Sequence, residues 1–189
     1  MSIHYSIVIP GKSITLRTLK EADGEPIYEN IRDIEITKYL RELPSPYLLS
    51  DAYNFIKAGK VLLKKGTEFD FAIEYTSPGK EPVFSGIIAL ANLKNNQKTN
   101  VKTAEVGYWV ARKYWGMGIG TEALLLATGY GFEELGMSAI FACVLKENAP
   151  SIHLLEKSGF SFDRELLKNT RKNGEWVDEL RYVKTKPSA

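Results

Sequence analysis

Cysteine and histidine are scarce in this chain of 189 residues, which has one Cys and two His. A single thiol excludes a disulfide framework within the chain, and so few thiolate and imidazole ligands exclude most structural zinc sites. The chain also has no large excess of charge of one sign, since its 25 Lys and Arg residues are nearly balanced by 23 Asp and Glu residues. A net charge of +2 does not favour nucleic acid or an anionic membrane as the main partner.

Long apolar runs are absent as well: no stretch approaches the roughly 20 apolar residues of a membrane span. Residues 1–10 lack the basic segment and the apolar run of a secretory signal, so we expect a cytoplasmic protein. The length and a hydrophobic fraction of 44% predict a single globular domain over residues 1–189.

Alternating and continuous apolar runs predict the strands of the fold. In Phe69–Tyr75, apolar residues at odd positions alternate with Asp70, Ala72 and Glu74, as in a half-buried strand. The predicted strands are Ile14–Leu19, Phe69–Tyr75, Val83–Leu93, Ala104–Val110, Ala139–Leu145 and Glu175–Val183. Thr76–Pro82 and Asn92–Thr103 are rich in Gly, Pro, Asn or Lys and predict connecting loops.

Helical patterns lie between these strands. The predicted helices are Lys20–Leu40 with a break near Asp33, Asp51–Lys65 with Ser50-Asp51 as its N-cap, Thr121–Gly136 and Ser151–Ser158. The order of elements predicts a mixed α+β domain that is built around one sheet.

Gly116, Gly118 and Gly120 follow a predicted strand and open a predicted helix. Glycines permit a close approach of the backbone to a ligand, and the start of a helix offers free N–H groups, so this loop suits a phosphate or pyrophosphate. A close-packed turn is the alternative. Thr121 rather than Lys follows the last glycine, which excludes a Walker loop. The intervening segment 111–115 and the G-x-G-x-G spacing fit a dinucleotide fingerprint poorly.

The loop Trp115-Gly-Met-Gly-Ile-Gly120 resembles the Q/R-x-x-G-x-G/A pyrophosphate loop of the GNAT acyl-CoA N-acetyltransferases, with Trp115 where Gln or Arg is more common. Ala104–Val110 is similar to the strand before that loop. Asn148-Ala-Pro-Ser151 and Glu156-Lys-Ser-Gly-Phe160 are similar to the N-x-x-S and E-K-x-G-F segments of the family. The resemblance covers nearly the whole chain and implies the GNAT fold, an α+β fold with a mixed central sheet flanked by helices.

Ile14–Leu19 followed by Asp23, and the pair Tyr114-Trp115, resemble the Rim-type branch, which acetylates the N-termini of ribosomal proteins. The resemblance implies transfer of an acetyl group from the co-substrate acetyl-CoA to a primary amine, by direct attack in a ternary complex. The implied acceptor is a protein N-terminal α-amino group. Alternatives are a polyamine or aminoglycoside acetyltransferase and a non-catalytic acyl-CoA-binding module. No metal, nucleic acid or membrane is implied, and we expect a monomer or homodimer.

The resemblance also implies where acetyl-CoA binds. Backbone groups of Trp109, Val110 and Ala111 are expected to pair with the pantetheine arm, and amides of the glycine loop to bind the pyrophosphate. The expected loop residues are Gly116, Met117, Gly118, Ile119, Gly120 and Thr121, and Asn148 is a further cofactor-binding candidate.

Glu105 is the first candidate for the general base, because family members often have a Glu at this position of the strand. A solvent-facing or cross-strand-paired Glu is the alternative reading. Asp70, Asp178 and Glu179 are weaker candidates for the same role.

Many relatives place a Tyr one residue before the Glu of E-K-x-G-F to protonate the leaving thiolate, but here this residue is Leu155. The Rim-like branch implies that Ser151 takes this role, while Asn148 orients the cofactor or a water. The alternative for Ser151 is N-capping of the helix after Pro150. We expect His153 and Cys143 to be structural.

Overall fold

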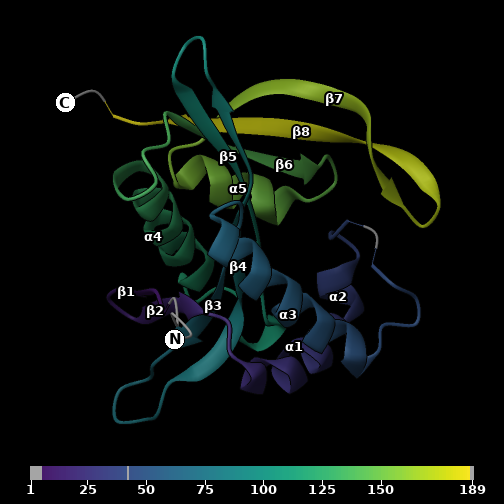
Figure 1. Ribbon diagram of the computed structural model, residues 1–189. Coiled ribbons are helices and arrows are strands. Elements are labelled where there is room, and N and C mark those ends of the chain that lie inside the picture. Colours follow the sequence, from purple (N-terminus) through teal and green to yellow (C-terminus); the bar gives the residue numbers. More distant parts are fainter. Residues whose placement is uncertain (1–5, 42, 188–189) are drawn as a thin grey trace.

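The computed structural model describes residues 6–41 and 43–187. Within these ranges, eight strands form one sheet in the order β1-β2-β3-β4-β5-β6-β8-β7 (Figure 1). The strands are β1 (Val8–Pro10), β2 (Ile14–Thr18), β3 (Phe69–Tyr75), β4 (Val83–Asn96), β5 (Val101–Val110), β6 (Ala139–Leu145), β7 (Ser161–Lys172) and β8 (Glu175–Thr185). Neighbouring strands are antiparallel except β5 and β6, which are parallel. The predicted α+β fold with a mixed central sheet is therefore confirmed.

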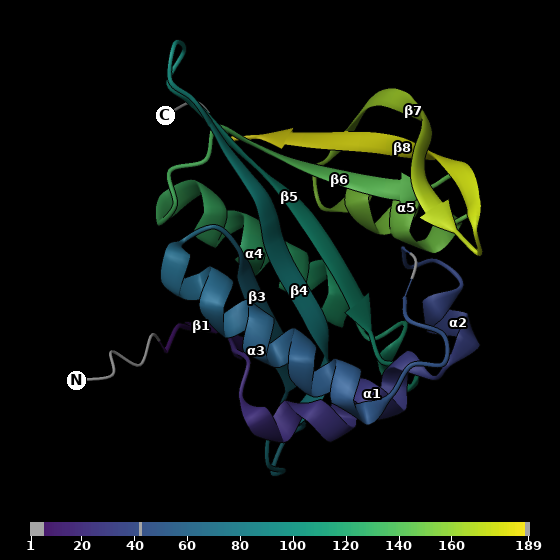
Figure 2. The ribbon, with the colours of Figure 1, turned by 45° about the vertical axis from the view of Figure 1, so that its right-hand side comes forward.

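Helices cover both faces of this sheet. They are α1 (Gly24–Ile31), α2 (Ile34–Thr37), α3 (Leu49–Lys65), α4 (Ile119–Glu133) and α5 (Ala149–Lys157), with short 3-10 turns at Glu21–Asp23 and Arg112–Tyr114. α1 and α3 lie on one face, and α4 and α5 lie on the other (Figure 2). The predicted break near Asp33 is confirmed, because Asp33 separates α1 from α2 and its side chain caps α2.

Two predictions about the elements are wrong, and two strands were not predicted. Asn92–Thr103 is not a loop, since β4 extends to Asn96 and β5 begins at Val101, which leaves a tight turn. Ser50-Asp51 does not precede α3 but lies in its first turn, where Asp51 Oδ2 accepts the Leu48 N–H at 2.8 Å. Strands β1 and β7 were not expected from the sequence.

The alternation in β3 divides the apolar core between the two faces. Phe71 and Ile73 belong to the larger core, which includes the apolar side of α4. Ala72 faces the opposite way, against Ile27 of α1 and Ile56 of α3. All three β3 side chains have no exposed surface, so the sheet is buried on both faces at this strand.

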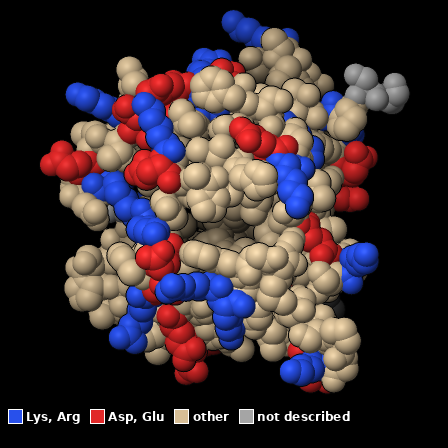
Figure 3. All heavy atoms as spheres, turned by 180° about the vertical axis from the view of Figure 1, so that it is seen from behind, with Lys and Arg blue, Asp and Glu red and all other residues tan. Residues whose placement is uncertain are grey.

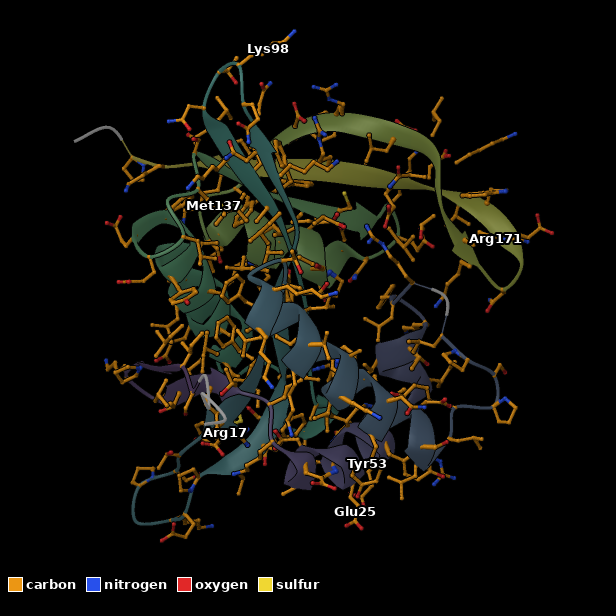
Figure 4. All side chains as sticks on the ribbon, viewed as in Figure 1. Arg17, Glu25, Tyr53, Lys98, Met137 and Arg171 are labelled. Carbon is orange, nitrogen blue, oxygen red and sulfur yellow. The ribbon has the colours of Figure 1, made fainter. Side chains whose placement is uncertain are left out.

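A buried ion pair links β2 to the turn before α1. The guanidinium of Arg17 donates to both carboxylate oxygens of Asp23, each at 2.7 Å, and Asp23 also accepts the Lys20 N–H at 2.8 Å. Arg17 is labelled in Figure 4. Such bidentate pairs are geometrically specific. The pair accounts for the spacing of the opening motif, which places a basic residue on the strand and Asp23 six positions later.

Asp70 lies on β3 beneath α3, away from the cleft described below. Its side chain approaches Gly59 so closely that a Cβ on Gly59 would lie 2.6 Å from Asp70 Oδ2. Its Oδ1 is buried and has no hydrogen-bond partner among the described residues. Burial, reinforced by the neighbouring Glu68, raises the pKa of Asp70 to about 7.

Two hairpins extend from the body of the protein, and Figure 4 labels Lys98 near the tip of one and Arg171 near the tip of the other. The β7–β8 hairpin approaches the segment after α2. There, Lys172 Nζ donates to the carbonyl of Leu40 at 2.7 Å and also to the carbonyl of Thr37. The hairpin therefore holds the segment that follows α2 beside the sheet.

The sheet opens between its two central parallel strands. β5 and β6 pair only at Thr103–Ala139, Ala104–Ile140 and Glu105–Phe141. Beyond these residues β5 continues to Val110 and β6 to Leu145, and the two strands diverge (Figure 2). Backbone groups that face this opening have no neighbouring strand to pair with, so the opening is suited to a ligand with its own amide groups.

Candidate active site

A cleft of about 570 Å³ occupies the opening between β5 and β6. This volume is typical of a site for a small molecule or a cofactor. Its walls come from both strands, the start of α4, α5 and the segment around α2. On the face opposite to that of Figure 1, a hollow near the centre is bordered mainly by uncharged residues (Figure 3).

The glycine loop forms the part of the cleft at the start of α4. Gly118 is the N-cap of α4 and has a left-handed backbone with φ of +79°, which explains why glycine is required there. The N–H groups of Ile119, Gly120 and Thr121 have no carbonyl within the helix to bond. Five of the six predicted loop residues line the cleft, namely Gly116, Gly118, Ile119, Gly120 and Thr121, whereas Met117 is exposed and does not. This end of the cleft can bind an anion.

The backbone of β5 turns alternately toward β4 and toward the opening. The Ala111 N–H donates to Ser85 O at 2.8 Å, and a Cβ on Gly86 would lie 2.3 Å from Trp109 O, so both peptides face β4. By the alternation of an antiparallel ladder, backbone groups of Tyr108 and Val110 face the opening. Of the three predicted pantetheine partners, Trp109 and Val110 line the cleft, and Val110 is the one whose backbone groups face the opening. The Val110 carbonyl accepts the Trp115 indole N–H at 2.7 Å.

Ser151 and Asn148 lie at the start of α5 and line the cleft. Asn148 is the N-cap, and its Oδ1 accepts the Ser151 N–H at 3.2 Å. Ser151 therefore does not cap the helix, and the alternative interpretation of Ser151 as the N-cap is wrong. Its Oγ lies 2.8 Å from the phenol oxygen of Tyr108 on β5.

Tyr108 was not predicted as a site residue. The sequence places Leu155 where many relatives have a tyrosine, and Leu155 is buried beside the cleft. The structure instead brings a phenol to Ser151 from the facing strand. Burial raises the pKa of Tyr108 to about 12, so this phenol stays protonated at neutral pH. Period-2 alternation predicts that Tyr108 faces away from Trp109, but nothing local to either segment predicts its contact with Ser151.

Glu105 stands at the last residue pair before the strands diverge, and on the opposite face from Tyr108. It is not free: Arg41 Nη2 lies 2.5 Å from its Oε1, and Asn92 Nδ2 donates to its Oε2 at 2.9 Å. Arg41 Nε also lies 3.7 Å from Oε1 of Glu179, whose side chain is only 3% exposed. Arg41 and Glu179 line the cleft, and no sequence motif predicts Arg41 as a site residue.

Two of the three weaker candidate acids lie away from the cleft. Asp70 is beneath α3, and Asp178 accepts the Lys168 N–H at 2.8 Å on an exposed part of the β7–β8 hairpin. Glu179 alone among the weaker candidates lines the cleft.

Cys143 and His153 also line the cleft. Burial, together with the charges of Glu105 and Glu179, raises the pKa of the Cys143 thiol to about 11, which keeps it protonated. A protonated thiol is a poor nucleophile. Among the described residues, the His153 side chain makes no hydrogen bond and no ion pair.

Comparison with known proteins agrees with this architecture. Residues 13–161 match the family described as the acetyltransferase (GNAT) domain. The chain belongs to the GNAT family. It is an acetyl-CoA-dependent N-acetyltransferase, and the glycine loop and the unpaired edge of β5 provide donors that suit the pyrophosphate and amide groups of this co-substrate.

Two curated relatives match this GNAT chain over most of its length. A probable N-acetyltransferase, YjcK of Bacillus subtilis, is 29% identical over 90% of this chain and 93% of its own. A spermidine N(1)-acetyltransferase of Escherichia coli K12 is 27% identical over 89% of this chain and 84% of its own. Among solved structures, RimL, a ribosomal L7/L12 alpha-N-protein acetyltransferase in complex with coenzyme A, superposes with a TM-score of 0.81 at 15% identity. It covers 95% of this chain and 98% of its own, and at this identity the likeness shows the fold.

No helix in residues 6–41 and 43–187 is long and apolar enough to span a membrane.

Proposed function

We propose that this enzyme acetylates the α-amino group of a protein or peptide N-terminus. The observation that carries the proposal is the engagement of Glu105. Arg41 and Asn92 occupy both of its carboxylate oxygens, at 2.5 and 2.9 Å. Because both oxygens already accept these contacts, the carboxylate offers no free oxygen to the proton of an incoming amine. The site is therefore better suited to an acceptor that loses its proton readily.

An α-amino group meets this requirement. Its pKa is about 7.7–8.0, so about a third of it is neutral near pH 7.5, whereas an alkylamine with a pKa of about 10.4 is neutral in only about one molecule per thousand. The fold shared with RimL, whose name states an alpha-N-protein activity, supports the same acceptor.

Residues on the other side of β5 supply the acid chemistry of the proposal. Acetyl-CoA brings a thioester, whose carbonyl carbon forms the new C–N bond while the C–S bond breaks. Ser151 Oγ donates its proton to the departing sulfur, and Tyr108, 2.8 Å away, passes its phenol proton to Ser151. Tyr108 then regains a proton from solvent. Asn148 fixes Ser151 by accepting its N–H. The proton lost by the amine nitrogen passes to solvent.

The same proposal assigns the co-substrate contacts. Amides of Gly116, Gly118, Ile119, Gly120 and Thr121 bind the pyrophosphate, with the exposed Met117 between them. The backbone groups of Val110 that face the opening pair with the pantetheine arm. Trp109 and Ala111 hold Val110 in place, because their own backbone groups face β4.

Mass spectrometry tests the acceptor directly. Purified enzyme and acetyl-CoA are incubated with peptides that have free N-termini, the same peptides blocked at Nα but with a free Lys side chain, spermidine and an aminoglycoside. We expect mass gain on the free N-termini only, and kcat/KM that rises with pH through about 8, the pKa of the α-amino group. Acetylation of the blocked peptides or small amines alone would contradict the proposal.

Spermidine-type amines are a second candidate, because two carboxylates near the cleft attract cations and one full-length relative is a spermidine acetyltransferase. This candidate predicts acetylation of spermidine in the same panel, with kcat/KM still rising above pH 9 because of the higher amine pKa.

A further inference from the structure

Glu105 and Glu179 form a pair of carboxylates that converge on one cation. Each has one oxygen bound by an asparagine amide: Asn92 Nδ2 donates to Glu105 Oε2 at 2.9 Å, and Asn169 Nδ2 donates to Glu179 Oε2 at 2.5 Å. The remaining oxygens lie 2.5 and 3.7 Å from the guanidinium of Arg41. The two carboxylates are thus held independently of the cation between them.

Irregularities in two strands produce this arrangement. The β4–β5 register shifts between Ala91 and Lys94, and Asn92 has a left-handed backbone with φ of +50°. The β7–β8 register shifts between Leu166 and Thr170, a stretch that includes Asn169. Bulges redirect side chains and are common beside functional sites. Here each bulge presents an asparagine to a glutamate of the adjacent strand.

The segment that contains Arg41 is also held by a contact that does not involve the Arg41 side chain. Lys172 of the β7–β8 hairpin binds the carbonyls of Thr37 and Leu40 directly before it. The Arg41 side chain is 49% exposed, whereas that of Glu179 is 3% exposed. An ion pair with a half-exposed partner is weak, because solvent screens the charges. A competing cation can therefore displace the guanidinium while the segment stays in place.

Space for an acceptor lies next to this pair. Gly107 is two residues after Glu105 on the same face of β5, and it is exposed. A Cβ built on Gly107 meets nothing within 4 Å. A chain that passes over Gly107 reaches both the carboxylate pair and the opening between β5 and β6.

We propose that Glu105 and Glu179 bind a Lys or Arg side chain close to the N-terminus of a peptide acceptor, and that Arg41 occupies this subsite until the acceptor displaces it. The inference rests on the proposed function, since it assigns a second anchoring point to the same peptide. The cation bound between two carboxylates stays protonated, so it anchors the acceptor and is not the attacking amine. The attacking α-amino group is a different nitrogen, held at the opening.

Steady-state kinetics on matched peptides tests this subsite. One peptide series has Lys at position 2, 3 or 4 and Gln at the other two, and the reference peptide has Gln at all three. For the wild type we expect a lower KM for one Lys peptide than for the reference. In Arg41→Gln this KM falls further, by about two- to fivefold, because the competing guanidinium is gone. In Glu179→Gln the difference between the two peptides is lost.

Arg164→Gln is the control, because Arg164 is also an ion-paired arginine, with a side chain that is 61% exposed, but lies on β7 beside Asp163. It should leave the KM of both peptides as in the wild type. Equal KM values for Lys and reference peptides, or an Arg41→Gln enzyme with an unchanged or raised KM for the Lys peptide, overturn the inference while peptide acetylation itself stands. If no peptide is acetylated, the proposed function fails first. If only spermidine shows the KM change in Arg41→Gln, the occupant is a polyamine and the peptide subsite is wrong.

Discussion

The phenol oxygen of Tyr108 lies 2.8 Å from Oγ of Ser151, which joins β5 to α5 across the cleft. The two residues are 43 positions apart in the sequence. Leu155 of α5 stands where the family resemblance implied a tyrosine, and this contact provides a phenol from the opposite wall instead. The pair is the centre of the acid chemistry proposed above.

Removal of either hydroxyl should slow the chemical step. We expect Ser151→Ala to lower kcat by about 100-fold and Tyr108→Phe by about 10-fold, with little change in the KM for acetyl-CoA. Because the hydroxyls act in series, the double variant should be no slower than Ser151→Ala by itself. Steady-state rates with saturating acetyl-CoA measure these effects. Tyr130→Phe is the control, since Tyr130 packs on Phe71 away from the cleft. Unchanged kcat in both single variants would remove the pair from the mechanism.

A side chain at Gly107 should block the acceptor and not the co-substrate. Its position is exposed on the face of β5 that bears Glu105, with free space around it. We expect Gly107→Leu to raise the KM for the peptide about tenfold or more, because the leucine fills the path of the acceptor. The dissociation constant of coenzyme A, measured by calorimetry, should change less than about twofold. An equal loss of both affinities would place the acceptor elsewhere.

The left-handed backbone of Gly118 should make it sensitive to alanine. Gly118→Ala adds a Cβ at φ of +79° and should destabilise the protein by about 1–2 kcal/mol, while weakening coenzyme A binding. Gly129 offers a matched control inside α4, where a Cβ meets nothing within 4 Å. Gly129→Ala should stabilise the protein by about 0.5–1 kcal/mol. Urea denaturation measures the free energy of unfolding of both variants. An unchanged free energy of unfolding in Gly118→Ala would contradict the strain argument.

Asp70 should make stability depend on pH. Its folded pKa of about 7 lies above its ordinary value of 3.8, so the folded state binds the proton more tightly than the unfolded chain does. The free energy of unfolding is therefore highest below about pH 4 for this group, and it falls by about 1.4 kcal/mol per pH unit until about pH 7.

Asp70→Asn should remove that fall, so its gain in stability over the wild type should be larger at pH 8 than at pH 5. Denaturation curves at both pH values measure the difference, with the exposed Glu81→Gln as a control that should show no such dependence. A gain that is equal at both pH values would mean that the carboxyl is not protonated in the folded protein.

Much of the fold follows from local sequence patterns. The alternation of β3 and the apolar run of β6 predict their bounds, because each is buried against helices. β7 was not predicted, because two register shifts interrupt its alternation of apolar and polar residues. Its many polar residues fit an edge strand. β1 is only three residues long and ends in a proline, so it leaves almost no pattern. A single domain over residues 1–189 stays a prediction.

The candidate site divides in the same way. The glycine loop is predictable, because its function depends on consecutive backbone groups and leaves a contiguous signature. The role of Arg41 is not predictable from the sequence, because its partner Glu105 is 64 residues later and no local motif links the two residues. The engagement of Glu105 likewise depends on the bulge at Asn92, which periodicity does not show. Sequence alone thus finds the proposed cofactor end of the cleft better than the proposed acceptor end.

The short pairing of β5 with β6 has a consequence for rigidity. Three residue pairs join the half of the sheet from β1 to β5 to the half made of β6, β8 and β7, and α4 packs on strands of both halves. A ligand that bonds the free edge of β5 extends the hydrogen-bonded ladder where the protein leaves it incomplete. Binding energy then appears as resistance to unfolding. Bound coenzyme A should therefore stabilise the whole sheet. Amide hydrogen exchange should slow in both halves of the sheet and not only at the residues that contact coenzyme A.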